Sequence, residues 1–322
     1  MSELASPPTD PSGGRRRPTG LRADLRAAIP DALAALLVTA TVFVVLYARV
    51  RAGTSDTVAV MPFLADADEY WMYWLSQAFG WSALLWAWGT VVLGLLLSGP
   101  RPRRLATSVA RIERLHRTTS LSAIALMFAH ALMFFAELVR YEDELGWAAR
   151  IGAAYLETFV PGGYTSGTGQ IAIPIGQAAM YLALPLGLMF YARHRIGART
   201  WRNLHRFVIV CYVLAVWHTL LYGTNVWYDG WPRTALWLAQ LPIAVLLLAR
   251  LLRPSRRGER LRAGGGDRRR GLLPVWLRLA GRAAAVLVIV ALVAVVVTGR
   301  DGGRPAPGAG DGHATHTEEG TG

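Results

Sequence analysis

Seven apolar segments of membrane-spanning length constrain the fold of this chain most strongly. They cover residues 31–50, 75–97, 118–138, 171–191, 204–222, 234–252 and 275–297. An α-helix needs about 20 apolar residues to cross the roughly 30 Å hydrocarbon layer of a bilayer. Backbone groups in lipid must be satisfied within the protein, and runs this rich in Leu, Ala and Val favour helices over barrel strands. The sequence therefore predicts an all-α integral membrane protein, with a six-helix bundle and a seventh, C-terminal transmembrane helix.

The basic residues indicate how these segments are oriented. The formal charge is +13, and all 34 basic residues are Arg. Most of them fall within 1–29, 98–117, 192–206 and 250–282, which share one side of the membrane if the segments alternate. Basic residues in short flanking loops are retained on the cytoplasmic side. We therefore expect a multi-pass protein of the plasma membrane, with its N-terminus cytoplasmic and its C-terminus extracytoplasmic. Because the positive charge lies in the loops on one side of the membrane, it is explained by membrane orientation. Lipid rather than nucleic acid is therefore the expected partner.

Composition divides the chain into five regions. They are predicted to be a disordered cytoplasmic tail (1–29), the six-helix domain (30–252), a basic linker (253–273), the additional transmembrane helix (274–298) and a disordered extracytoplasmic tail (299–322). The two tails lack the apolar content needed to offset the entropy of ordering. Cys211 is the single cysteine, which excludes an intramolecular disulfide and any multi-cysteine metal site. It is expected to be a small packing residue.

Four histidines fall on two of the predicted helices. His116 and His130 are fourteen residues apart on the third, and His205 and His218 are thirteen residues apart on the fifth. Ionisable residues within membrane spans are costly and mark functional sites. Both helices run outward from the cytoplasm, so His116 and His205 lie at one depth in the membrane. His130 and His218 lie together at a second depth. Two imidazoles at one depth can fill both axial positions of a haem iron. The sequence thus predicts two haems, one above the other, about 20 Å apart along the helices.

An arginine follows each of the two inner histidines. Arg117 and Arg206 lie at the predicted membrane boundary, where guanidinium groups can pair with haem propionates. They can equally be positive-inside anchors. The sequence leaves both roles open.

Helical rotation raises a question about the fifth segment. At about 100° per residue, fourteen steps return His130 to within about 40° of the face of His116, but thirteen steps leave His218 about 140° from the face of His205. The fifth segment therefore needs local overwinding, a bulge or a bend, or else the two haems are approached from different sides of it.

The segments that carry the histidines resemble a known family. "RLHRTTSLSAIALMFAH" at 114–130 and "WRNLHRFVIVCYVLAVWH" at 201–218 resemble the ferric reductase-like transmembrane domain, which is shared by ferric reductases, NADPH oxidases and the haem-binding membrane partner of periplasmic methionine sulfoxide reductase. The resemblance covers roughly 31–252. It implies that His116 and His205 bind an inner b-type haem through its iron, and that His130 and His218 bind an outer one.

The same resemblance implies an activity. It points to a transmembrane di-haem b-type cytochrome that moves electrons from a cytoplasmic flavoprotein or a membrane quinol to an extracytoplasmic acceptor, either a ferric chelate or a partner reductase. After the sixth segment no strand leads into a G-x-G-x-x-G turn, and the glycines at 264–266 lie in an Arg-rich linker. We therefore expect an oxidoreductase membrane subunit with no flavin or NAD(P) site of its own, which takes electrons from a separate donor.

The alternative is a non-redox membrane protein, a transporter or scaffold whose intramembrane histidines relay protons or bond between helices. Proton relays usually mix His with Asp and Glu, whereas only Glu137 falls within the third segment, near its outer end.

Other aromatic and histidine residues have simpler expectations. His194 is expected to be solvated in its basic loop, and His313 and His316 either capture a metal or belong to a flexible tail. Trp201 is expected in the interfacial aromatic belt, and Trp217 either packs on the outer haem or faces lipid.

Overall fold

The structure is a computed structural model that describes residues 20–99, 108–141 and 144–252, together with isolated positions between 279 and 290. The described residues contain no β-strand. The helices that make up the candidate membrane spans are α1 (Leu21–Arg51), α3 (Trp71–Ser98), α4 (Val109–Tyr141), α6 (Gly169–Leu188), α8 (Ala198–His205), α9 (Val208–Tyr222), α10 (Trp231–Leu238) and α11 (Gln240–Leu252). They form six candidate spans, because α8 with α9 and α10 with α11 each act as one. The predicted all-α membrane fold is confirmed for these six. The predicted seventh helix at 274–298 and the tail at 299–322 lie outside the continuously described ranges.

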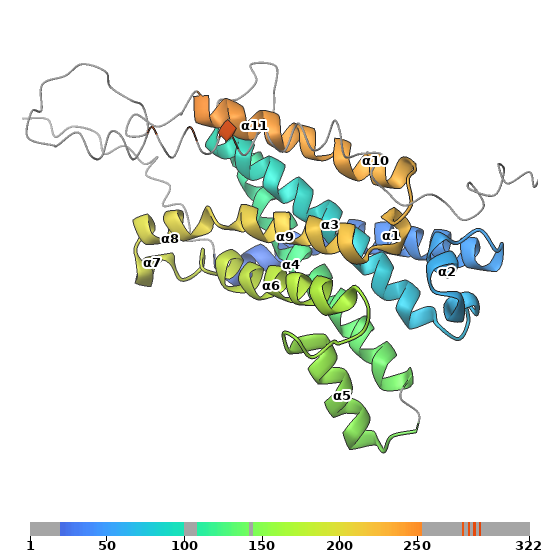
Figure 1. Ribbon diagram of the computed structural model, residues 1–322. Helices are drawn as coiled ribbons and strands as arrows, with labels where there is room; N and C mark the ends of the chain where they lie inside the picture. The colour runs from blue at the N-terminus through green and yellow to red at the C-terminus, as the bar shows by residue number, and fades with distance from the viewer. Residues whose placement is uncertain are drawn as a thin grey trace, which may run out of the picture.

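Short helices complete the described chain. They are α2 (Asp56–Val60), η1 (Pro62–Ala65), α5 (Trp147–Phe159), α7 (Arg193–Ile196) and η2 (Thr224–Val226). None of them was expected from the sequence, because none is long enough to cross a bilayer. α5 follows α4 and projects from the bundle (Figure 1). Its exposed apolar side chains, such as Trp147, lie beyond the end of the span and suit the membrane interface.

Helix α3 is the centre of the bundle. It packs chiefly on α4 and also contacts α1, α9 and α11, while α6 packs on α9 (Figure 1). Its side chains contribute to each of the three apolar clusters, through Trp74 at one end, Ala83 in the middle and Leu95 at the other end. α3 therefore packs on α4 and α9, which carry His116, His130 and His218.

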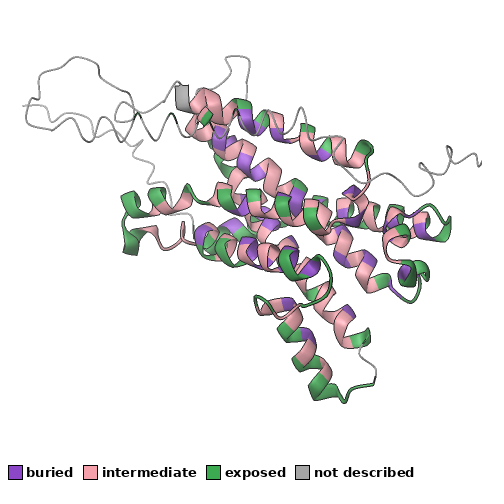
Figure 2. Ribbon diagram, viewed as in Figure 1, coloured by how far each residue is buried: buried purple, intermediate pink, exposed green. Residues whose placement is uncertain are grey.

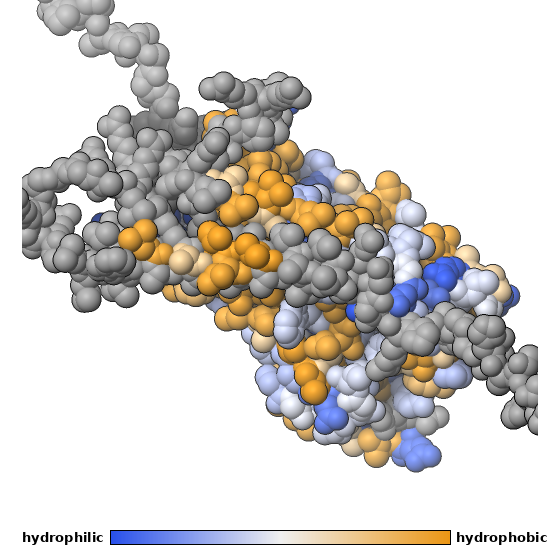
Figure 3. All heavy atoms as spheres, turned by 45° about the horizontal axis from the view of Figure 1, so that its top comes forward, coloured by the Kyte–Doolittle hydropathy of each residue, from blue (hydrophilic) through white to orange (hydrophobic). Residues whose placement is uncertain are grey.

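The outer surface of the bundle is apolar, as a lipid-facing surface must be. Leu33, Leu37 and Val44 of α1 are 60–70% exposed, and buried residues form only narrow stripes along the helices (Figure 2). Apolar side chains cover much of the coloured face shown in Figure 3, and hydrophilic ones gather in its right and lower parts. This distribution supports a multi-pass membrane protein.

The start of the first helix differs from the prediction. The tail was expected to reach residue 29, yet α1 begins at Leu21 and continues through Pro30. Asp24 is 5% exposed and pairs with Arg117 of α4, with Asp24 Oδ2 3.3 Å from Arg117 Nε. The low apolar content of this region favoured a disordered tail. Composition alone cannot show that a charged side chain such as Asp24 has a partner in a distant helix. Residues 1–19 lie outside the described chain.

The fifth span is interrupted where the rotation argument required a change. α8 ends at His205 and α9 begins at Val208. Phe207 N–H donates to Leu204 O at 3.0 Å, and Val210 N–H donates to Phe207 O at 2.9 Å. These are i→i−3 bonds, typical of a 3₁₀ turn, which rotates by about 20° more per residue than an α-helix. Of the alternatives left open, local overwinding is present, and it moves His218 part of the way back toward the face of His205.

Candidate functional site

The inner histidines of the two spans meet in the structure. His116 lies within α4 and His205 is the last residue of α8. Their ring centroids are 6.0 Å apart and their planes are 84° to each other. The sequence expectation that these two side chains match in depth agrees with this arrangement.

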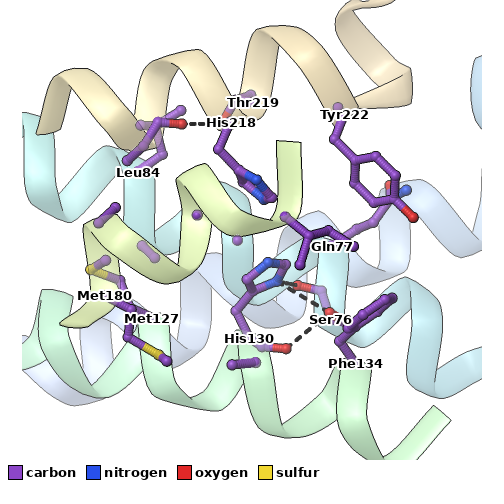
Figure 4. A pocket seen from close by; sticks show the side chains of 18 of the residues that line it. Ser76, Gln77, Leu84, Met127, His130, Phe134, Met180, His218, Thr219 and Tyr222 are labelled. Atoms are coloured by element: carbon purple, nitrogen blue, oxygen red, sulfur yellow. Dashed lines mark hydrogen bonds between the residues drawn. The ribbon is translucent and has the colours of Figure 1, made fainter. Parts of the chain in front are cut away.

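The outer histidines form a second pair of the same kind. The ring centroids of His130 and His218 are 6.2 Å apart, with an angle of 69° between the planes. His130 projects from α4 and His218 from α9 toward the same space (Figure 4). The thirteen-residue spacing in the fifth span is therefore compatible with two pairs.

The spacing within each pair fits a single metal ion between two imidazoles. A metal bound by two imidazole nitrogens at about 2 Å each holds those nitrogens about 4 Å apart, which places the ring centres about 6 Å apart. Both pairs have this separation. Each pair offers one nitrogen from each of two opposing helices, which suits the two axial positions of a haem iron. Haem ligation itself stays a prediction.

Three of the four imidazoles are oriented by backbone carbonyl groups. The Nδ1 atoms of His116, His130 and His218 lie 3.0, 2.8 and 2.8 Å from the carbonyl oxygens of Thr90, Ser76 and Ala172. A carbonyl oxygen can only accept, so Nδ1 must be the protonated nitrogen of the neutral ring. The opposite nitrogen, Nε2, is then free to bind metal. Metal-ligating histidines usually donate their other N–H in this way.

The fourth imidazole is held differently. His205 faces the carbonyl of Leu186, but its Nδ1 makes no hydrogen bond of normal geometry with the described residues. Instead, the ring of Trp201 stacks on it, with centroids 5.4 Å apart and planes at 27°. Trp201 was expected in the interfacial aromatic belt, and its contact with a paired histidine is a further role that the sequence did not predict. One turn of α8 brings the two rings together.

A cavity of about 170 Å³ contains the outer pair. Its walls are mostly apolar and include Met127, Phe134 and Met180, and Tyr222 and Gln77 lie toward one end (Figure 4). Trp217, which was expected either to pack on an outer haem or to face lipid, does not line this cavity and is 58% exposed. The outer pair therefore borders a mostly apolar space.

The outer end of this cavity is polar, and side-chain hydrogen bonds there link residues from different parts of the chain. Asn225 Nδ2 donates to Gln77 Oε1 at 2.8 Å, and Gln77 Nε2 donates to the hydroxyl of Tyr73 at 3.2 Å. Two further lining side chains, Thr158 and Gln177, have a buried oxygen with no hydrogen-bond partner among the described residues. These groups offer neutral donors and acceptors to the polar edge of a bound molecule.

A smaller cavity of about 50 Å³ lies deeper in the bundle. It is bordered by Thr90, Gly187 and Cys211, among others. The carbonyl of Thr90 faces His116, but neither His116 nor His205 lines this cavity. Cys211 is buried and borders a small space, as expected for a packing residue.

The two arginines that follow the inner histidines have different surroundings. Arg117 is one-fifth exposed and pairs with Asp24 and, through its NH1 atom at 3.1 Å, with Glu113. Tyr191 also donates to Asp24, at 3.1 Å. Burial and the neighbouring Asp24 carboxylate raise the pKa of Tyr191, so its hydroxyl stays a donor. Arg206 is exposed. A propionate role remains a prediction for both, and Arg117 already has carboxylate partners.

Comparison with known families supports the resemblance. Residues 80–216 match the family model described as the ferric reductase like transmembrane component. The match runs from α3 into α9 and includes His116, His130 and His205, ending two residues before His218. The family resemblance drawn from the sequence is therefore confirmed over this range. No curated protein and no solved structure gives a significant match to the chain.

Proposed function

We propose that this ferric reductase-like membrane chain is a transmembrane di-haem b-type cytochrome. The observation that carries the proposal is the presence of two histidine pairs, each with its ring centres about 6 Å apart. In three of the four rings, Nδ1–H points to a backbone carbonyl oxygen. His116 and His205 would hold the inner haem, and His130 and His218 the outer one.

The residues of the chain define what such a site can do. When bound, a haem supplies a one-electron Fe(III)/Fe(II) couple. With the two histidines of each pair as its ligands, the iron would have no open position, so the site would favour electron transfer over binding a substrate at the metal. The fixed Nδ1 bonds hold the rings in place, and the apolar walls keep water away, which limits the reorganisation that accompanies a change of charge.

The direction of transfer follows from the topology. The inner pair lies near the Arg-rich side and the outer pair near the opposite side. We propose that electrons enter from a cytoplasmic flavoprotein or a membrane quinol and leave to an extracytoplasmic acceptor, either a ferric chelate or a partner reductase. The N-terminus would be cytoplasmic and the protein would lie in the plasma membrane.

A reduced-minus-oxidised absorption spectrum of the detergent-purified, haem-replete protein tests the proposal. We expect a b-type α-band and a pyridine haemochrome value of about two haems per chain, because each histidine pair ligates one. A proton-relaying transporter or scaffold would have no such band. Its absence from a haem-replete preparation would overturn the cytochrome proposal.

The orientation has a separate test, which uses the single native cysteine. Cys211 is buried, so the native protein should react little with a membrane-impermeant maleimide in intact cells. Ala65 precedes α3 and Arg111 lies near the start of α4, and both are exposed. We expect Ala65→Cys to be labelled in intact cells and Arg111→Cys only after permeabilisation. The reverse pattern would show an inverted topology.

A further inference from the structure

Three glycines lie directly against the paired imidazoles. A Cβ atom built on Gly80 would lie 3.1 Å from His130 Nδ1, one on Gly94 would lie 3.2 Å from His116 Cε1, and one on Gly176 would lie 2.7 Å from His218 Nδ1. Contacts this short are rare or absent for real Cβ atoms. Each imidazole therefore occupies space that any other residue would fill.

The same glycines stand in one fixed relation to the carbonyls that orient the rings. Ser76, Thr90 and Ala172, whose carbonyl oxygens face Nδ1, each precede one of the glycines by four residues. In an α-helix the side chain at i+4 leans back over the turn that contains the carbonyl of residue i. That carbonyl already accepts the backbone N–H of residue i+4, and its second lone pair is usable only if the approach is open. Glycine leaves it open.

The fourth histidine shows what happens without this arrangement. The residue four positions after Leu186 is Phe190. The Nδ1 of His205 forms no hydrogen bond of normal geometry with the described residues, and Trp201 stacks on its ring instead. Gly187, in the same helix, faces Ile124 rather than a histidine. The three rings that lie against a glycine are thus the three whose Nδ1 lies 2.8–3.0 Å from a carbonyl oxygen.

We propose that Gly80, Gly94 and Gly176 are positioning residues for haem ligation, which rests on the function proposed above. Each opens a helix wall so that one imidazole can donate Nδ1–H to a backbone carbonyl and present Nε2 to the metal. Gly94 serves the inner haem, whereas Gly80 and Gly176 serve the outer one. This role is more specific than the general use of glycine for close helix packing.

Glycine-to-alanine variants of the full-length protein test this assignment. In Gly176→Ala and Gly80→Ala we expect the affinity for the outer haem to fall by about 10- to 100-fold, as for loss of other groups that orient metal ligands, with the larger effect at Gly176. Gly94→Ala should affect only the inner haem. Gly89→Ala is the matched control, because Gly89 lies in α3 with no atom within 4 Å of its Cβ position.

The readouts are the haem content, the midpoint potential of each haem and the low-spin ferric EPR signals. The unaffected haem reports folding in the same molecule, because a misfolded chain would lose both. Variants that all match Gly89→Ala, or that all lose both haems, would overturn the assignment. A native protein without haem would instead overturn the proposed function, so the two failures are distinguishable.

Discussion

Replacing His130 or His218 by alanine is expected to remove the outer haem while the inner haem stays bound. The two rings form one pair, 6.2 Å apart, and both line the outer cavity. Loss of one ligand would leave a haem held by a single imidazole. The inner pair contacts different carbonyls and is 14 residues away along α4, or about 20 Å. Each variant should therefore bind about one haem per chain.

Inner-site variants should give the complementary result. His116→Ala and His205→Ala are expected to lose the inner haem and keep the outer one, with separate EPR signals identifying which remains. His194→Ala is the control, because His194 is exposed in the short α7 helix and belongs to neither pair. If every single replacement removes both haems, the two sites are not independent. If none removes a haem, these histidines are not the ligands.

The sequence predicted the parts of this site that depend on regular helical geometry. The lengths of the apolar segments predicted the six spans. The alternation of the segments across the membrane predicted that His116 and His205 would pair. The difficult angle between His205 and His218 also came from that geometry, and it predicted an irregularity in the fifth span, which the structure places at Arg206 and Phe207. No sequence signal distinguished overwinding from a bulge, because both involve only a few ordinary backbone bonds.

The features that the sequence did not reveal are contacts between distant helices. Gly80, Gly94 and Gly176 are unremarkable among 33 glycines until the histidines that face them are known. Spacing within one helix cannot show which carbonyl on another helix will face an imidazole. Asp24 was assigned to a disordered tail for the same reason, since its partner lies 93 residues further along the chain.

The pairing of Asp24 with Arg117 leads to the second large effect. Arg117→Met would leave the Asp24 carboxylate, which is 5% exposed, without its cation. Breaking a buried ion pair by removing one partner costs about 3–5 kcal/mol, because the remaining charge stays desolvated. We expect a loss of about 3 kcal/mol, measured as thermal unfolding in detergent. Arg114→Met is the matched control, since Arg114 lies in α4 three residues before Arg117 but is exposed, and exposed substitutions usually change stability by about 0.5 kcal/mol or less.

A double variant separates the two roles that the sequence left open for Arg117. Asp24→Asn combined with Arg117→Met removes both charges and keeps an acceptor for Tyr191, so most of the lost stability should return. Because Asp24 and Glu113 already occupy the guanidinium group, we expect the double variant to keep its inner haem with an unchanged spectrum. A double variant that is stable but loses the inner haem would instead show that Arg117 holds a propionate. In that case removal of the positive charge should also lower the inner midpoint potential in Arg117→Met, because a nearby cation favours the reduced, less positive iron.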